Sequence, residues 1–183
     1  MQTEIIIAGF GGQGVLFGGQ VVAYAAMDAG KEVTWIPSYG PEMRGGTANC
    51  TVVIADEEIG SAIVEHPPLA IALNLPSFDK YEEALQSGGT LIVNKSMVDR
   101  GPQRDDIHAV FVPCNEIAEE LGDKKLLNMV AIGALLTALT EITLADVEKA
   151  LRGHMPARHQ DLLQKNLEAL KRGYEAARAV PAG

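Results

Sequence analysis

Short apolar runs alternate with longer segments of mixed polarity along most of the chain. Glu4–Ala8 and Leu69–Leu73 are aliphatic runs that end at turn-forming residues, which is typical of buried strands. Val15–Ala29 has the length of a helix, and Gly30 supplies its C-terminal stop. We expect Pro37 to end a second strand, because proline has no N–H to donate to a strand ladder. The strands predicted in this way are Glu4–Ala8, Glu32–Ile36, Ala48–Ile54, Leu69–Leu73, Thr90–Val93 and Ala109–Val112.

Helices dominate the last third of the sequence. Ser77 and Asn115 are placed to cap two shorter, earlier helices, and Thr143–Asp146 resembles a capping box that opens a later one. Leu126–Leu139 is apolar and predicts a buried helix, because it is shorter than the roughly 20 residues that span a bilayer. His159–Ala179 predicts a long, charged C-terminal helix with an apolar stripe.

The alternation of strands and helices favours an α/β fold. We expect a Rossmann-like, mostly parallel sheet with helices on both faces and a helical C-terminal third. No change in composition marks a linker, so a single domain over residues 1–183 is expected. Apolar residues make up 47% of the chain and charged residues 21%, which excludes an intrinsically disordered protein.

Charge and cysteine content narrow the class of function. The net charge of −9 disfavours nucleic acid as a partner. The N-terminus lacks the basic stretch of an export signal, so a cytoplasmic protein without membrane attachment is expected. Cys50 and Cys114 are too few to hold an iron–sulfur cluster. No histidine and carboxylate pattern has metal-ligand spacing, and no serine lies in a nucleophile elbow, so we predict neither a metal site nor a catalytic residue.

A glycine-rich segment follows the first predicted strand and opens the first predicted helix. Its G-x-G-x-x-G spacing is that of a dinucleotide-binding fingerprint, in the context that the fingerprint requires. The acidic residue that such a site needs after the second strand is missing, because Trp35–Ser38 contains no acid. The alternatives are a tight turn without a ligand, another phosphate-bearing ligand, or contact with a partner's backbone. The candidate binding residues here are Gly9, Gly11, Gly12, Gln13 and Gly14.

A second glycine-rich segment, Ser38–Thr47, follows the second predicted strand. Loops that follow parallel strands emerge at the same edge of a sheet, so we expect both segments to line one crevice. Arg44 could approach a planar or phosphate group there, although a surface salt bridge with Glu42 is the alternative. The candidate binding residues in this segment are Ser38, Tyr39, Glu42, Arg44, Gly45 and Gly46.

Together, these segments resemble a known family. Gly9–Val15 followed by Ser38–Gly46 is similar to the gamma subunit, or gamma domain, of 2-oxoacid:ferredoxin oxidoreductases. Leu127–Ala134 resembles a helix of the same family, so the similarity extends over nearly the whole chain. Phe10 is closer to the 2-oxoglutarate and branched-chain members than to the pyruvate members, which favours 2-oxoglutarate as the substrate.

The resemblance implies an enzyme that decarboxylates a 2-oxoacid with coenzyme A, giving an acyl-CoA, CO2 and reduced ferredoxin. It places thiamine diphosphate and magnesium on alpha and beta subunits, and 4Fe–4S clusters on the beta or a delta subunit. The gamma subunit would contact these partners, reach ferredoxin only through the complex, and help to hold coenzyme A. This chain lacks the GDG-to-asparagine pattern of the thiamine site, which agrees with that division. The rival hypotheses are a standalone nucleotide-binding regulatory module and a purely structural subunit.

Overall fold

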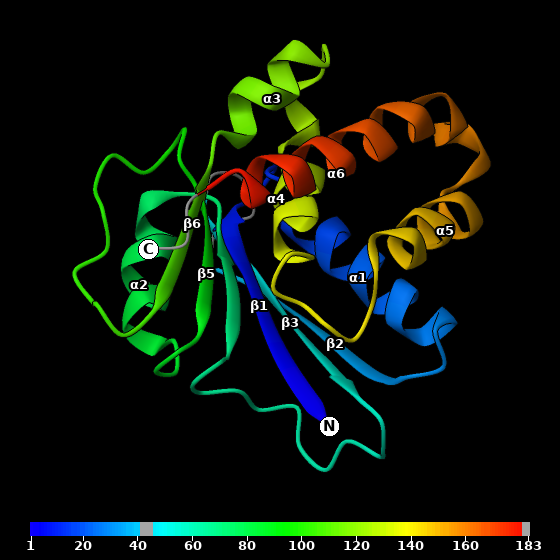
Figure 1. The fold of residues 1–183 in the computed structure, drawn as a ribbon. Helices are drawn as coiled ribbons and strands as arrows, with labels where there is room; N and C mark the ends of the chain where they lie inside the picture. The colour runs from blue at the N-terminus through cyan, green and yellow to red at the C-terminus, as the bar shows by residue number, and fades with distance from the viewer. Residues whose placement is uncertain (41–45, 181–183) are drawn as a thin grey trace.

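A computed structural model describes residues 1–40 and 46–180 of the protein. Its centre is one six-stranded sheet with the strand order β2-β3-β1-β4-β5-β6 (Figure 1). The strands are β1 (Gln2–Phe10), β2 (Glu32–Tyr39), β3 (Thr47–Ala55), β4 (Leu69–Ala72), β5 (Thr90–Asn94) and β6 (His108–Val112). All six predicted strands are therefore confirmed, with ends that shift by a few residues.

The sheet is mixed, with parallel strands in the majority. β1, β4, β5 and β6 pair in parallel, whereas β3 runs antiparallel between β1 and β2. β2 and β3 form a hairpin, so β2 lies one strand further from β1 than it would in a dinucleotide-binding fold. The predicted mostly parallel α/β sheet is confirmed, and the inserted β3 is its departure from the Rossmann order.

The prediction that Pro37 ends the second strand is wrong. Pro37 is paired with Cys50, and β2 continues to Tyr39. This is possible because β2 is the outermost strand of the sheet, so a residue without an N–H need not interrupt a ladder on both sides.

Helices cover both faces of the sheet, and the last third is helical, as predicted. Figure 1 shows α1, α4, α5 and α6 on one face and α2 on the other. The helices are α1 (Val15–Asp28), α2 (Leu75–Ala84), α3 (Cys114–Glu120), α4 (Leu127–Leu135), α5 (Leu144–His154) and α6 (Leu163–Arg178), with short 3-10 turns η1 (Lys124–Leu126) and η2 (Ala157–Leu162).

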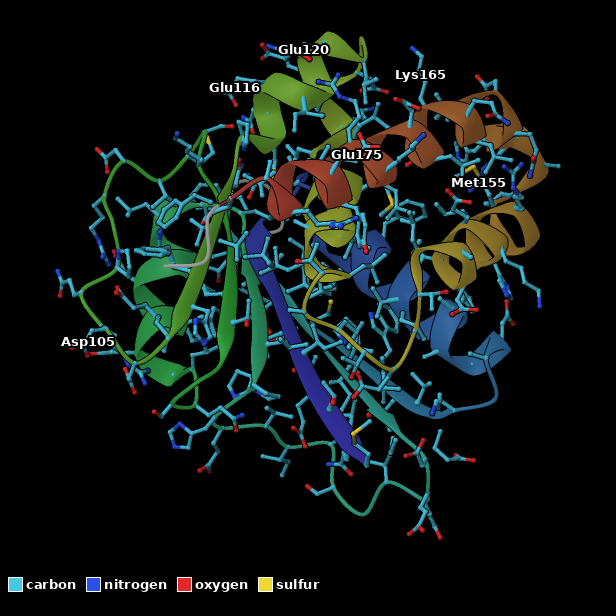
Figure 2. The ribbon with its side chains drawn as sticks, in the orientation of Figure 1. Asp105, Glu116, Glu120, Met155, Lys165 and Glu175 are labelled. Carbon is cyan, nitrogen blue, oxygen red and sulfur yellow. The ribbon has the colours of Figure 1, made fainter. Side chains whose placement is uncertain are left out.

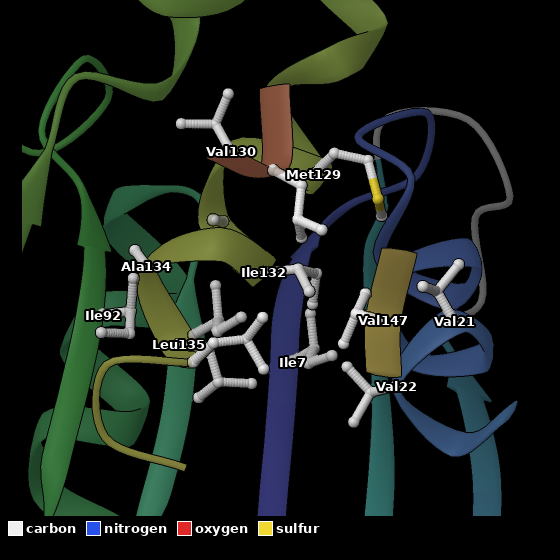
Figure 3. Close-up of a cluster of buried hydrophobic side chains, with 14 of the residues drawn as sticks. Ile7, Val21, Val22, Ile92, Met129, Val130, Ile132, Ala134, Leu135 and Val147 are labelled. Atoms are coloured by element: carbon white, nitrogen blue, oxygen red, sulfur yellow. The ribbon is translucent and has the colours of Figure 1, made fainter. Parts of the chain in front are cut away.

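The main core lies between the sheet and α6, with α4 in its middle. Every residue of α4 is buried, and its side chains meet Ile7 of β1, Ile92 of β5 and Val147 of α5 (Figure 3). Two glycines let α4 and α6 cross closely. A Cβ on Gly133 would lie 1.9 Å from the carbonyl oxygen of Leu170, and one on Gly173 would lie 1.9 Å from that of Val130. No larger residue fits this crossing without moving a helix.

Two predicted caps are wrong. Asn74, not Ser77, caps α2, because its side chain accepts a hydrogen bond from the N–H of Ser77. Asn115 lies inside α3 and accepts a hydrogen bond from Asn94 instead. The capping box at Thr143 is confirmed, since its hydroxyl and the Asp146 carboxylate bond reciprocally to backbone N–H groups.

The two long helix predictions were too long. The apolar helix ends at Leu135 rather than Leu139, and Lys124–Leu126 before it forms the separate turn η1. The C-terminal helix begins at Leu163 rather than His159, because His159 belongs to η2. Both extra turns border the cavity described below, so the breaks in these helices help to shape it.

Candidate functional site

The two glycine-rich segments meet at the C-terminal edge of β1, as predicted. The N–H of Gly11 donates to the carbonyl of Gly46 at 2.9 Å. Phe10, the last residue of β1, is paired with Thr47, the first residue of β3. The loop of residues 9–14 and the C-terminal end of the β2–β3 hairpin loop are thus held together by backbone contacts.

The Gln13 side chain is hydrogen-bonded within the protein. Its side-chain oxygen accepts a hydrogen bond from the N–H of Phe10 at 2.7 Å, and its amide donates to the carbonyl of Leu73 at 3.2 Å. Asn74 donates to the same oxygen at 3.3 Å. Gln13 therefore ties the end of β1 to the end of β4, and it sets the shape of the loop.

Two glycines of the first loop have left-handed backbone conformations. Gly12 has φ 96° with open space around it, and Gly14 has φ 73°. A Cβ on Gly14 would lie 2.3 Å from the amide of Asn128, which donates to the carbonyl of Gly14 at 3.0 Å. A Cβ on Gly9 would collide with the Gln13 side chain. Close packing thus requires Gly9 and Gly14, whereas Gly12 leaves the loop open to approach.

The start of α1 is free of side-chain caps. Gly14 occupies the capping position without a side chain, and no acidic residue lies in the first turn of the helix. The first backbone N–H groups of a helix lack intrahelical partners and carry a partial positive charge. The N-terminal end of α1 is therefore suited to bind a phosphate or carboxylate group.

A cavity of about 300 Å³ opens beside this helix end. The last third of the chain supplies most of its walls, including Met155, which Figure 2 shows between α5 and α6. Lys125 and His159 add basic groups to an otherwise largely apolar lining. The lining residues are Gly12, Gly14, Phe17, Asp123, Lys125, Leu126, Asn128, Met155, Pro156, His159, Leu162 and Asn166.

Two buried asparagines differ in how they are used in this cavity. Asn128 is hydrogen-bonded through both ends of its amide, because its nitrogen donates to the carbonyl of Gly14 in the loop and its oxygen accepts from the N–H of Met129 in α4. Asn166 is 7% exposed, and its amide donates to Leu162. Within residues 1–40 and 46–180, the oxygen of Asn166 has no hydrogen-bond donor, so it is an acceptor available to an occupant of the cavity.

The predicted residues of the second loop divide into two groups. Ser38 and Tyr39 are exposed at the end of β2 and do not line the cavity. Glu42, Arg44 and Gly45 lie outside the described residues, and so does the predicted alternative of a salt bridge between Glu42 and Arg44. Sequence inspection missed the asparagines and Lys125, which only the packing of the C-terminal helices brings to the first loop.

A family model described as "Pyruvate ferredoxin/flavodoxin oxidoreductase" matches residues 4–176. The chain belongs to this family. The resemblance inferred from the two glycine-rich segments is thereby confirmed.

Relatives of this oxidoreductase family differ in length. The chain is 35% identical to "2-oxoglutarate synthase subunit KorC" of Methanocaldococcus jannaschii, with 98% of this chain and 96% of the relative covered. It is 34% identical to "Ketoisovalerate oxidoreductase subunit VorA" of Methanothermobacter marburgensis over 97% of this chain, but it spans only 37% of that relative.

Two solved structures share the fold. A "keto/oxoacid ferredoxin oxidoreductase, gamma subunit" from Geobacter sulfurreducens superposes with a TM-score of 0.86 at 28% identity, covering 98% of both chains. A 2-oxoglutarate:ferredoxin oxidoreductase from Magnetococcus marinus "with 2-oxoglutarate, coenzyme A and succinyl-CoA bound" gives a TM-score of 0.87 at 25% identity. It covers all of this chain and 32% of the other.

The dinucleotide alternative fits this family member poorly. In a Rossmann fold, the second strand lies beside β1, and an acidic residue at its end binds the ribose. In this chain, the strand beside β1 is β3, and the start of β3 lies at that edge. That position is occupied by Thr47, and the end of β2 lies one strand further away. Within residues 1–40 and 46–180, the residue paired with the end of β1 is therefore not the acid that a dinucleotide site uses to bind ribose.

The two buried thiols of this chain are poor nucleophiles. Burial raises the pKa of the Cys50 thiol to about 12, and burial also raises the pKa of the Cys114 thiol. Among the described residues, no three His, Cys, Asp or Glu side chains converge as a metal site. No helix in the described part of the chain is both long enough and apolar enough to cross a membrane.

Proposed function

We propose that this chain is the gamma subunit of a 2-oxoacid:ferredoxin oxidoreductase and works only in a complex. The match to KorC over nearly the full length of both chains carries this proposal. The VorA relatives are more than twice as long, so in them a single polypeptide contains a region like this one together with further sequence. Partner chains would supply that further part here.

The proposed complex divides the chemistry among its subunits. The partner chains would carry thiamine diphosphate, magnesium and 4Fe–4S clusters, which provide the carbanion stabilisation and the electron transfer. The gamma subunit would position a substrate against those cofactors, and correct positioning is itself a large part of catalysis. Ferredoxin would be reached through the complex.

Coenzyme A is the ligand that we propose for the cavity beside α1. The uncapped start of α1, Lys125 and His159 would attract phosphate groups, and the apolar walls would cover an uncharged part of the molecule. The free acceptor on Asn166 would receive a hydrogen bond from the ligand. When bound, the thiol of coenzyme A is the group that accepts the acyl product.

We place 2-oxoglutarate first among the substrates. The relatives whose length matches this chain include several named as 2-oxoglutarate synthase subunits, at 31% to 37% identity. A "Pyruvate synthase subunit PorC" of similar coverage is 29% identical. The pocket that chooses the 2-oxoacid would lie on the partner subunits, so this preference is a statement about the whole complex.

Coexpression with the alpha and beta subunits tests the proposal. The complex with and without this chain is assayed for ferredoxin or viologen reduction with 2-oxoglutarate, 2-oxoisovalerate and pyruvate. We expect activity only with this chain present, and the highest kcat/KM with 2-oxoglutarate. Equal activity without the chain would refute its role as a required subunit. Tight binding of ATP or NAD to the isolated full chain would instead support the regulatory module.

A further inference from the structure

A second, smaller pocket lies at the same sheet edge on the opposite face, beside α2. Its volume is about 80 Å³. β1 and β3 form one wall with Ala8 and residues 47–49, and the first half of α2 forms the other. The full lining is Ala8, Thr47, Ala48, Asn49, Pro76, Ser77, Lys80 and Tyr81. Because Ala8 precedes Gly9, the pocket is adjacent to the first glycine-rich loop but separated from the α1 cavity by the sheet.

Two side-chain hydroxyl groups belong to buried residues that line this pocket. Ser77 is 8% exposed and Tyr81 is 5% exposed. Neither hydroxyl forms a hydrogen bond within residues 1–40 and 46–180. Neither oxygen is among the fully enclosed atoms without a partner, and both residues line the pocket. Because both hydroxyls are unpaired among the described residues and both residues line one small pocket, each can donate a hydrogen bond to a molecule that enters it.

The charge of the pocket indicates the sign of that occupant. Among the described residues, Lys80 is the one charged residue in the lining, in a chain with a net charge of −9. Among the described residues its ammonium group makes no ion pair, and it lies 5.1 Å from the centre of the Tyr81 ring. Asn49 adds an amide that can donate a further hydrogen bond. In the part of the lining that the structure describes, one cation lies with several donors and without a carboxylate, which suits an anion.

The helix end contributes little by itself. Asn74 already caps the N–H of Ser77, and Pro76 has no N–H. Side chains rather than backbone donors would therefore make the contacts. A volume near 80 Å³ holds about two or three water molecules, which is also the scale of a phosphate or carboxylate group but not of a whole nucleotide.

We propose that this α2 pocket, formed by Ser77, Lys80, Tyr81 and Asn49, binds a small oxyanion, namely a phosphate group or a carboxylate. The hydroxyls of Ser77 and Tyr81 donate to the anion, and Lys80 neutralises it. The anion is either a free ion or the charged end of a small molecule that reaches the edge of the sheet. This site is independent of the proposed coenzyme A cavity, which uses other residues on the other face.

The test measures thermal unfolding and calorimetric binding of the full chain with inorganic phosphate and, separately, with acetate, at constant ionic strength. A ligand that binds only the folded state raises its melting temperature in a saturable way. Tyr81→Phe removes only the hydroxyl, and Lys80→Gln removes the charge. Their matched controls are Tyr174→Phe and Lys171→Gln on α6, on the far side of the sheet.

We expect saturable binding that Lys80→Gln weakens about tenfold and Tyr81→Phe about fivefold, while both controls bind like the wild type. Saturation by phosphate identifies a phosphate-bearing ligand, and saturation by acetate identifies a carboxylate. No saturable binding of either ion, or equal binding by Lys80→Gln and the wild type, overturns the proposal. Binding that is lost in Lys125→Gln but kept in Lys80→Gln also overturns it, because that ion occupies the α1 cavity. The proposed subunit function is assayed separately and survives either result.

Discussion

The two faces of the sheet are stabilised by different means. On one face, α1, α4, α5 and α6 bury a large apolar core, and α4 and α6 cross at the contact distance that Gly133 and Gly173 allow. On the other face, a single helix, α2, covers a small apolar cluster. There a polar network centred on Glu82 fastens the loop that leads to β6.

The two pockets at the sheet edge differ in the same way as the two faces on which they lie. The face covered by α1, α4, α5 and α6, called the thick face, has enough packed helices to enclose a mostly apolar cavity beside the first glycine-rich loop. The face covered by α2 alone, called the thin face, has a small pocket at this edge, which Ser77, Lys80 and Tyr81 of α2 help to line. We therefore expect packing to dominate the stability of the thick face and polar contacts to dominate that of the thin face.

The largest effect is expected at the crossing of α4 and α6. Gly133→Ala or Gly173→Ala would force a methyl group against a backbone carbonyl oxygen. Each should therefore lower the free energy of unfolding by more than about 3 kcal/mol or prevent folding. Urea unfolding followed by circular dichroism measures the loss.

Gly153→Ala is the matched control for the crossing. Gly153 also lies in a helix, α5, but nothing surrounds its Cβ position within 4 Å. Alanine has the higher helix propensity, so this variant should be more stable by about 0.5–1 kcal/mol. If all three alanine variants unfold at the same urea concentration, close packing does not dominate this face.

On the thin face, Glu82→Gln should cost about 2 kcal/mol of unfolding free energy, because a charge-assisted network is lost. Glu82 is 5% exposed and accepts hydrogen bonds from Arg100 at 2.8 Å and from the backbone N–H groups of Gln103 and Arg104. The neighbouring exposed Glu83 provides the control, and Glu83→Gln should change stability by less than about 0.5 kcal/mol. Equal effects of the two substitutions would show that the network contributes nothing.

In the loop that follows β1, Gln13→Ala should lower the free energy of unfolding by about 1 kcal/mol, because it removes the hydrogen bonds that join the end of β1 to the end of β4. Because the loop loses its shape, KM for coenzyme A in the complex should also rise. Gln20→Ala, on the outer surface of α1, is the control. A stable Gln13→Ala variant with an unchanged KM would mean that Gln13 does not shape a binding loop.

The smallest effect is the acid sensitivity of the thin face. Burial alone would raise the pKa of Glu82, but the hydrogen bonds from Arg100, Gln103 and Arg104 outweigh it and lower the pKa below its ordinary value of 4.5. The folded state therefore holds the proton less tightly than the unfolded state. The contribution of the Glu82 carboxylate to the free energy of unfolding is complete above pH 4.5 and is lost as the pH falls through the lowered pKa. The stability difference between wild type and Glu82→Gln should shrink over that range, whereas a constant difference would exclude this cause.

Local signals in the sequence predicted much of this structure. The aliphatic runs predicted all six strands, and the glycine-rich segments predicted the edge at which two loops meet. The antiparallel β3 between β1 and β2 was not predicted, since strand direction depends on pairing between distant segments. The role of Asn74 as a cap was missed because Ser77, three residues later, has the same preference for that position.

The candidate site was predicted only in part, for the same physical reason. Gln13 has the character of a polar ligand contact in the sequence, but its partners Phe10, Leu73 and Asn74 come from three different elements. Lys125 and Asn166 lie more than a hundred residues from the first loop. Their place beside it follows from helix packing, which no local pattern encodes.

The central claim is that the α1 side of the sheet edge holds coenzyme A in the complex. Lys125 lines that cavity, whereas its neighbour Lys124 has a side chain that is 83% exposed and does not line it. The deciding measurement is KM for coenzyme A in complexes that contain Lys125→Gln or Lys124→Gln. We predict a rise of about fivefold to tenfold for Lys125→Gln alone, with kcat unchanged, because a binding contact is lost equally in the ground and transition states. An unchanged KM for Lys125→Gln, or the same rise for both variants, would contradict the account.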